Sequence, residues 1–190
     1  MTFGRSLPGR RALLTATALA VALTLALLGA AAAIAGNMSF QSGGVKLGSV
    51  IFDGVVIGVG SDVLEVEVTA NAIVTLECTN KGGTAAPGRN LVEVLVSTSG
   101  TFTPDENGKV EITGLTVEDP DLSDIQPSPS PKTAGCPSAK WTVSDVIQVF
   151  WTTVTVTATD LDGAQQAEDT LTFDCTGLTE PGDVCPQVSG

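Results

Sequence analysis

Over residues 64–78 every even position is apolar, and every odd position except Ile73 is polar. A period of two predicts a strand with one buried face. Fifteen such residues in one strand would span roughly 50 Å, far beyond the usual strand length. We therefore expect a turn at Ala70–Asn71, because asparagine tolerates a left-handed backbone, and a hairpin of strands 62–69 and 72–79.

Strand patterning recurs along the rest of the chain, in segments rich in valine and threonine that are separated by turn signals. No segment of ten or more residues after position 35 has a helical period of apolar residues. This pattern predicts an all-β fold, an antiparallel immunoglobulin-like β-sandwich of about seven short strands. The further strand segments are 45–60 as one long or bulged strand, 91–98, 109–117, 145–160 and 168–175.

The segment 145–160 changes phase in its middle. Ile147, Val149 and Trp151 follow one phase, and apolar residues from Val154 onward follow the other. An extra residue in a strand produces such a slip, so we expect a β-bulge near residues 152–153. In 168–175 the apolar residues keep one phase, which predicts a single buried face.

Residues 118–141 interrupt the strand rhythm with five prolines. Proline cannot donate to a sheet ladder, so a central strand is excluded here. We expect an extended surface loop inside one domain, with Cys136 fixing its far end. A domain boundary is the alternative, but neither half has enough strands to close a core alone.

The first residues carry three arginines and no acid, and an uncharged apolar run follows over residues 12–35. The run ends in Ala33-Ile34-Ala35, an A-x-A pattern before Gly36. A basic start, an apolar middle and a small-residue end predict a secretory signal peptide over residues 1–35. An uncleaved membrane anchor is the alternative, because 24 apolar residues are long enough to span a bilayer.

Without this segment the chain is one domain, residues 36–190, with residues 176–190 as a C-terminal tail. It keeps 6 Lys and Arg against 21 Asp and Glu, a net charge of −15. Such a surface repels nucleic acid and anionic membranes, so we expect neither as a partner. We expect the mature protein to be secreted and extracellular.

All four cysteines, Cys78, Cys136, Cys175 and Cys185, follow the signal segment. An even number in an exported chain predicts two disulfides. We favour Cys78–Cys136, which would clip two long loops, and Cys175–Cys185, whose intervening Pro-Gly allows a turn. The alternative, Cys78–Cys175, would join two inward-phased strand ends as in antibody domains.

The glycine-rich stretch "CTNKGGTAAPGRN", residues 78–90, has the G-x-x-x-x-G spacing of a phosphate loop. A nucleotide site also needs Lys-Ser/Thr and a helix after the last glycine. Arg89-Asn90 and a strand pattern follow instead. The chain has no histidine, so Cys78 also lacks the usual base of a catalytic thiol. We expect a stapled surface loop and no nucleotide.

The motifs "CTNKGGTAAPG", "GCPSAKW" and a final pair of cysteines together resemble a group of small secreted bacterial proteins. The resemblance spans Gly48 to Cys185. It implies an extracellular β-sandwich with two disulfides and carries no established activity. The long Ser-Pro loop departs from the group.

Carboxylates are the abundant chemistry of the chain. Asp160 and Asp162 in "DLDG" resemble the start of a calcium loop, with Glu168 and Asp169 nearby. The twelfth residue is Leu171, where an EF-hand needs glutamate, and Asp-Gly between strands is also a hairpin turn signal. A hairpin turn is favoured over a Ca²⁺ site. A second acidic cluster comprises Glu118, Asp119, Asp121 and Asp124 and could join the first in space.

Paired carboxylates can hydrolyse glycosidic bonds, but no pair is marked here, and only Trp141 and Trp151 could stack on a sugar. We therefore expect no enzyme and no cofactor. The sequence favours a secreted structural or binding module that contacts an extracellular protein or a cell-envelope glycan. A calcium-dependent adhesion module is the alternative, and a carbohydrate hydrolase is the third reading.

Overall fold

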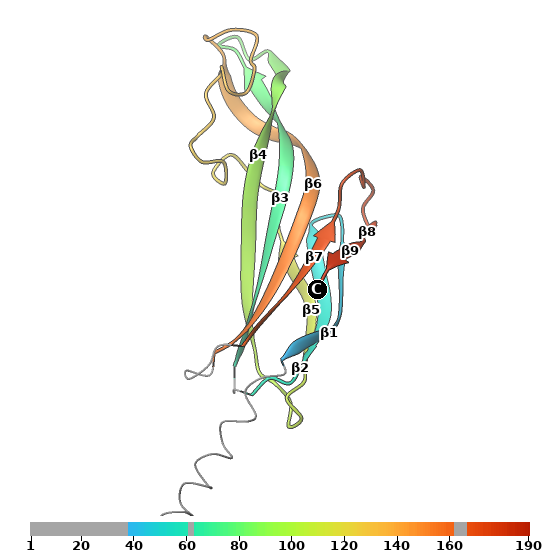
Figure 1. Ribbon diagram of the computed structural model, residues 1–190. Helices are drawn as coiled ribbons and strands as arrows, with labels where there is room; N and C mark the ends of the chain where they lie inside the picture. The colour runs from blue at the N-terminus through green and yellow to red at the C-terminus, as the bar shows by residue number, and fades with distance from the viewer. Residues whose placement is uncertain (1–37, 61–62, 162–166) are drawn as a thin grey trace, which may run out of the picture. The chain divides into compact units, whose positions relative to one another are not determined.

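The computed structural model describes residues 38–60, 63–161 and 167–190 of the chain. These residues form nine strands and no helix. The strands make two antiparallel sheets that pack face to face around one apolar core (Figure 1). The all-β sandwich predicted from the sequence is confirmed.

The strand order is that of an immunoglobulin-like sandwich. In one sheet, β1, β2 and β5 occupy the positions of strands A, B and E, and in the other β4-β3-β6-β7 follows the order C′-C-F-G. The first sheet has the order β5-β2-β1-β8 and contains β1 (Ser39–Lys46), β2 (Val50–Ile57), β5 (Val110–Val117) and β8 (Val184–Cys185). The second has the order β4-β3-β6-β7-β9 and contains β3 (Leu64–Thr79), β4 (Ala85–Phe102), β6 (Thr142–Asp160), β7 (Glu168–Asp174) and β9 (Gln187–Ser189).

The hairpin predicted within residues 62–79 is wrong, because β3 runs through Ala70–Asn71 as one strand of 16 residues. β3 pairs with β4 on one side and β6 on the other from Leu64 to Thr79, apart from local register shifts, so the strand needs no turn to satisfy its backbone. Asn71 does not adopt a left-handed backbone, since no described residue other than glycine has a positive φ. The alternation was the better guide than the usual length of strands.

The single strand expected at 45–60 is also wrong. The chain turns at residues 47–49 and forms the antiparallel pair β1 and β2. Gly48 has a φ of 142° in this turn, a value that favours glycine. Both strands are rich in apolar residues, so the pattern of apolar positions gave no sign of the turn between them.

β6 contains the bulge expected near residues 152–153. Asn71 pairs with Thr153 and Ala72 with Trp151, which leaves Thr152 as the extra residue. The carbonyl of Thr152 accepts the N–H of Cys175 at 2.8 Å. A second irregularity near Ile147 was not foreseen and leaves this side chain 47% exposed, although the alternation had placed it inside.

Phe52 organises the core between the sheets. Its ring lies over Gly43 and Gly54, which face each other in the β1–β2 register. A Cβ at Gly54 would collide with the ring, and one at Gly43 would collide with Leu171 and lie 3.0 Å from the ring. The ring also makes edge contacts with Phe40 and Phe173, at centroid distances of 6.0 and 6.4 Å. In β7, Leu171 and Phe173 are buried on one face, as the sequence predicted.

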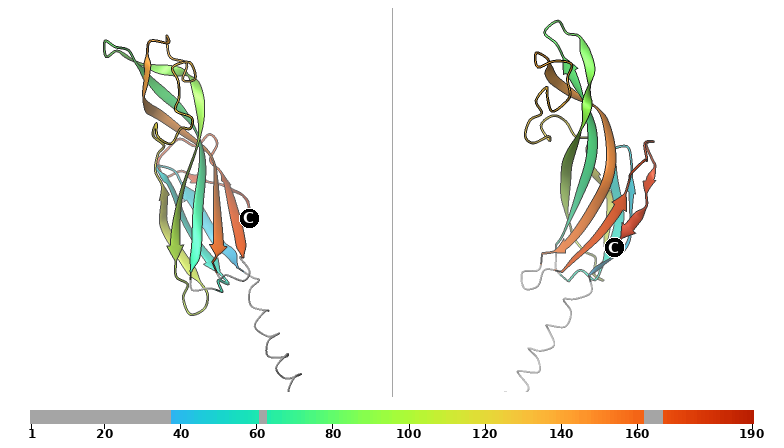
Figure 2. Two further views of the ribbon diagram at one scale, coloured as in Figure 1. Left: turned by 90° about the vertical axis from the view of Figure 1, so that its left-hand side faces the viewer. Right: turned by 45° about the horizontal axis from the view of Figure 1, so that its top comes forward.

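Three strands extend beyond the sandwich. We call the paired ends of β3, β4 and β6, residues 74–79, 85–92 and 142–149, the arm. Figure 2 shows the loop between β5 and β6, in yellow to orange, beside this arm. The loop is residues 118–141, as expected, and Ile125 and Ala134 from it are buried with Leu76 of β3 in the core cluster.

The residues after 175 form more than a tail. β8 pairs with β1 in one sheet, and β9 pairs with β7 in the other. The C-terminal segment therefore joins the edges of both sheets.

Candidate functional site

The glycine-rich stretch begins with the turn between β3 and β4. The side-chain oxygen of Asn80 accepts the N–H groups of Gly82 and Thr84 at 2.8 and 3.0 Å. Gly83 has a φ of 79°, which glycine adopts without strain. A strand follows this turn, so the stretch lacks the helix that a phosphate loop requires.

The end of the stretch bulges out of β4. Thr75 of β3 pairs with Leu91, whereas Glu77 pairs with Pro87, so β4 has extra residues between them. In this bulge the N–H groups of Arg89 and Asn90 turn away from β3 and donate to the carbonyls of Gly135 and Ala134, each at 3.2 Å. The Asn90 side chain donates to the carbonyls of Lys132 and Thr133 at 3.3 and 3.0 Å.

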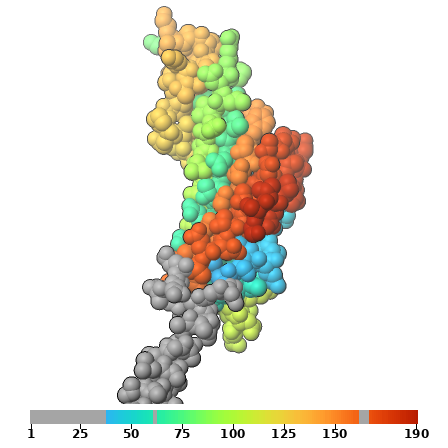
Figure 3. All heavy atoms as spheres, viewed as in Figure 1, coloured from blue at the N-terminus to red at the C-terminus, as the bar shows by residue number. Residues whose placement is uncertain are grey.

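Two glycines permit this close approach. A Cβ at Gly88 would collide with the carbonyl oxygen of Ala134, and one at Gly135 would lie 2.8 Å from the Asn90 nitrogen. Figure 3 shows the loop, in yellow and orange, packed against the green atoms of β4. The glycine-rich stretch is therefore the docking element for the proline-rich loop.

The cysteines pair as the loop argument favoured. Cys78 bonds to Cys136 across 58 residues, and Cys175 bonds to Cys185 across 10. The first bond fixes the loop on the arm beside the Gly88–Asn90 bulge. The alternative Cys78–Cys175 pair is excluded, because the two cysteines lie beside distant points of β6. Cys78 pairs with Val143 in the sheet, whereas the N–H of Cys175 donates a hydrogen bond to the carbonyl of Thr152. Nine residues of strand separate these points by about 30 Å.

Asp160 has a structural contact at the opposite end of β6. The side chain is 5% exposed, and one carboxylate oxygen accepts the N–H of Gly60 at 2.8 Å. Its own N–H donates to the carbonyl of Ala167 at 2.9 Å. Asp162, its expected companion in a Ca²⁺ site, lies outside the described residues. Among the described residues, no three Asp, Glu, Cys or His side chains cluster with metal-ligand geometry.

The members of the two acidic clusters that the structure describes do not combine, contrary to the idea that they could. Asp169 accepts the N–H of Phe40, which lies near the start of β1, at 2.7 Å. Glu118 is 3.4 Å from the hydroxyl of Ser49, which lies beyond the end of β1. The length of β1 separates them.

The second acidic cluster is a folded turn. Asp121 accepts hydrogen bonds from the hydroxyl and the N–H of Ser123 at 2.5 and 2.6 Å, and these lower its pKa below the ordinary 3.8. Asp124 accepts the N–H of Asp121 at 2.8 Å. Each of these carboxylates therefore has a role in holding the loop.

Neither tryptophan offers a fully exposed stacking surface. Trp151 is 5% exposed, and Trp141 is partly buried against the core.

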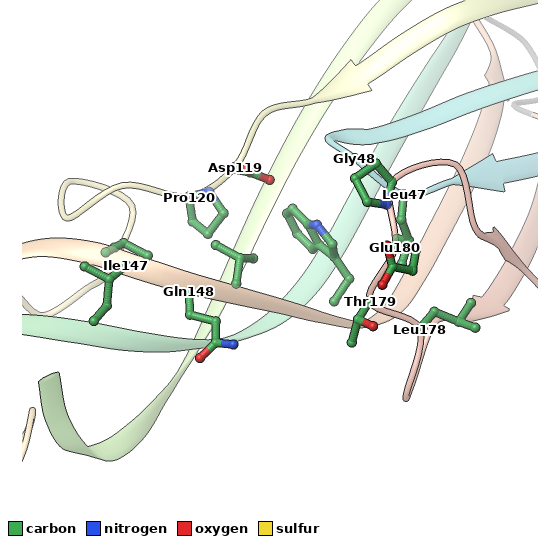
Figure 4. Close-up of a pocket in the computed structure, with 13 residues that line it drawn as sticks. Leu47, Gly48, Asp119, Pro120, Ile147, Gln148, Leu178, Thr179 and Glu180 are labelled. Atoms are coloured by element: carbon green, nitrogen blue, oxygen red, sulfur yellow. The ribbon is translucent and has the colours of Figure 1, made fainter.

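A cavity of about 280 Å³ lies where four segments of the chain meet. We call it the junction cavity, and Figure 4 shows its labelled residues arranged around the opening. The lining comes from the β1–β2 turn (Leu47, Gly48), the proline-rich loop (Asp119, Pro120), β6 (residues 146–149 and Trp151) and the segment 178–181.

Hydrogen bonds and a disulfide hold these walls in place. The N–H of Leu47 donates to the carbonyl of Asp183 at 2.9 Å, and the carbonyl of Leu47 accepts the N–H of Gly182 at 2.7 Å. This links the β1–β2 turn to the loop closed by the Cys175–Cys185 bond. Two of the four walls of the cavity are therefore tied to each other.

Four polar side chains contribute to the lining of the cavity, and all four are exposed to solvent: Asp119, Gln148, Thr179 and Glu180. Their side chains make no hydrogen bond to any part of the chain that the structure describes. Burial, and secondarily the charge of Glu118, raises the pKa of Asp119 above its ordinary 3.8. Partly desolvated carboxylates of this kind are common at binding sites.

The sequence analysis named Asp119 and Trp151 as candidate residues but did not predict that they line the same cavity. Gln148, Thr179 and Glu180 carried no local signal, because a cavity assembled from four distant segments has no motif. The unexpected exposure of Ile147 at its rim follows from the bulge in β6.

No protein family, curated protein or solved structure matches the chain in the comparisons. Within the described ranges no helix is long and apolar enough to span a membrane.

Proposed function

We propose that the protein is a secreted, non-catalytic binding module that takes a small group of a cell-envelope glycan into the junction cavity. The observation that carries this proposal is the convergence of four exposed polar side chains on one cavity, where they make no hydrogen bond within the described chain and are open to a ligand. Polar groups that converge on a concave site fix the orientation of a small ligand and give the site its specificity.

The chemistry of the cavity favours a ligand that donates hydrogen bonds. Asp119 and Glu180 bring carboxylates, and Gln148 adds an amide oxygen. Sugar hydroxyls and amino groups are suitable donors, whereas the surplus of acidic residues in the chain disfavours anionic ligands. The volume of about 280 Å³ is near the lower end for small-molecule sites and suits a single unit of a polymer.

Export is supported by the N-terminal segment and by the two disulfides, which persist in oxidising compartments. We propose a non-catalytic role because the chain has no histidine and its sequence marks no carboxylate pair for acid–base chemistry. Calcium-dependent adhesion remains the alternative, and it depends on Asp162.

Calorimetric titration with soluble cell-envelope glycan fragments tests the proposal. We expect binding that weakens roughly tenfold in Gln148→Ala and in Asp119→Asn, since each removes about one hydrogen bond. The control is Glu67→Gln, which changes an exposed carboxylate on β3, away from the cavity.

Equal binding by all three variants would place the ligand elsewhere, and no binding by the parent protein would refute the glycan proposal. The titration is repeated with Ca²⁺ and with chelator. Binding that requires Ca²⁺ would favour the adhesion alternative.

A further inference from the structure

β4 forms the free edge of the five-stranded sheet. Its hydrogen-bonded neighbour in the sheet is β3. Near the start of β4, the N–H groups of Arg89 and Asn90 donate to carbonyls of the proline-rich loop. From Leu91 to Phe102 no described residue pairs with its outer side. Alternate N–H and C=O groups on the outer side of residues 91–102 therefore have no strand partner, although Leu115 of β5 lies close to β4 at Gly100.

This edge lacks the features that usually block strand pairing. Natural edges carry charges, prolines or inward-pointing lysines, whereas Glu93 is the one charged residue in 91–102 and no proline occurs there. Leu91 and Leu95 are 64% and 59% exposed on its outer face. The neighbouring strands add Ile73 and Phe150 to the same face, because these two residues pair with each other.

We propose that β4 pairs antiparallel with β4 of a second copy of the chain, about a two-fold axis at Leu95. The pairing would join the two five-stranded sheets into one continuous sheet. Its backbone hydrogen bonds would satisfy the free edge of both copies at once.

The register follows from the side chains on the outer face. With the axis at Leu95, this residue meets its own copy, Glu93 lies opposite Ser97 of the second copy, and Leu91 lies opposite Ser99. A serine hydroxyl donates to a carboxylate, so the one charge of the edge is satisfied. An axis at Glu93 would place two carboxylates directly opposite each other, which is destabilising.

Charge restricts where two copies of the chain can meet. The chain excluding residues 1–35 has a net charge of −15, so two copies repel each other over most of their surface. The β4 edge is where charge is sparse and where a two-fold contact is self-complementary, as an isologous interface requires.

Sedimentation velocity over a range of concentrations tests the proposal on the purified protein with both disulfides formed. We expect a reversible monomer–dimer equilibrium, with hydrogen-exchange protection of residues 91–102 that rises with concentration. Leu95→Lys should weaken the dimer by about tenfold or more, because the change occurs twice at the axis. Ile147→Lys, an equal charge change at a similarly exposed side chain away from the edge, should leave it unchanged.

A second variant does not depend on the folding of Leu95→Lys. Leu95→Cys should form a covalent dimer on mild oxidation, since directly opposed Cβ atoms lie within reach of a disulfide. Ser99→Cys, which faces Leu91 of the second copy, should not. A chain that stays monomeric at every concentration would overturn the proposal. So would equal weakening by both lysine variants, or protection of β4 only when another protein is added.

Discussion

Single residues decide whether the proline-rich loop can dock on the arm. Gly135 has a φ of 70°, and its open Cα side faces the backbone nitrogens of Arg89 and Asn90. Two requirements therefore meet at one position: a left-handed backbone and the absence of a side chain. Gly177 has a similar φ of 81° but nothing within 4 Å of its missing Cβ.

This difference allows the cost of docking to be separated from the cost of backbone strain. Both Gly135→Ala and Gly177→Ala should lose about 1–2 kcal/mol of unfolding free energy from the left-handed backbone. Gly135→Ala should lose roughly 1–3 kcal/mol more, because its Cβ would crowd the β4 bulge. Denaturant unfolding of the two variants measures the gap. Equal losses would mean that the loop adjusts without cost.

Two neighbouring aspartates should respond to pH in opposite directions. The pKa of Asp119 is raised above 3.8, mainly by burial, so its folded form binds a proton more readily than its unfolded form. Its contribution to stability is present below 3.8 and is lost as pH rises through the folded pKa. Asp119→Asn should therefore raise the melting temperature at neutral pH, and the gain should vanish near pH 3.8.

Asp121 provides the opposite control. Hydrogen bonds from Ser123 lower its pKa, so its contribution is present above 3.8 and is lost as pH falls through the folded pKa. Asp121→Asn should lower the melting temperature at neutral pH and have little effect in acid. Melting curves at several pH values test both signs, and a parallel response of the two variants would contradict the assignment.

Among the elements, the long strands explain what the sequence could and could not predict. The alternation of residues 64–78 identified the buried face of β3, and the phase slip in 145–160 located the bulge at Thr152. Strand ends were less predictable, because β3 and β6 pair along their whole length and no local turn signal limits them. The turn at Gly48 was missed because apolar residues flank it on both sides.

The two disulfides should contribute unequally to stability. In the loop-entropy model, the 58-residue loop closed by Cys78–Cys136 is worth about 4 kcal/mol, and the 10-residue loop closed by Cys175–Cys185 about 3 kcal/mol. The double variant Cys78→Ala/Cys136→Ala should therefore unfold more readily than Cys175→Ala/Cys185→Ala. Denaturant unfolding under oxidising conditions makes the comparison.

Hydrogen exchange adds a local measure. Loss of Cys78–Cys136 should raise exchange in residues 118–141 and in the arm, whereas loss of Cys175–Cys185 should act on β8 and β9. The reverse order of stabilities, with no added exchange in the loop, would show that the hydrogen bonds at Gly135 and Ala134 hold the loop without the disulfide.

For the whole molecule, the sandwich was predictable and the junction cavity was not. Strand periodicity is a local property, and it indicates a two-layer fold wherever it recurs with turns. The cavity depends on how a turn, a loop, a strand and the C-terminal segment meet, which is set by packing between Leu47, Asp119, Gln148 and Glu180. Of these, only Asp119 belonged to a cluster visible in the sequence.

Export is the prediction that concerns the chain as a whole. The first strand begins at Ser39, so cleavage before Gly36 would remove none of the described fold. We expect the protein recovered outside the cell to start near Gly36 and to contain both disulfides, because the A-x-A pattern ends at Ala35. N-terminal sequencing and the intact mass of the extracellular protein measure both features.

Ala33→Arg places a large charged residue in the cleavage pattern and should leave an uncleaved chain on the membrane, whereas Ala31→Gly, outside the pattern, should be processed normally. Recovery of only the full-length, membrane-bound parent chain would instead establish residues 12–35 as an anchor, and the binding module would then act at the cell surface.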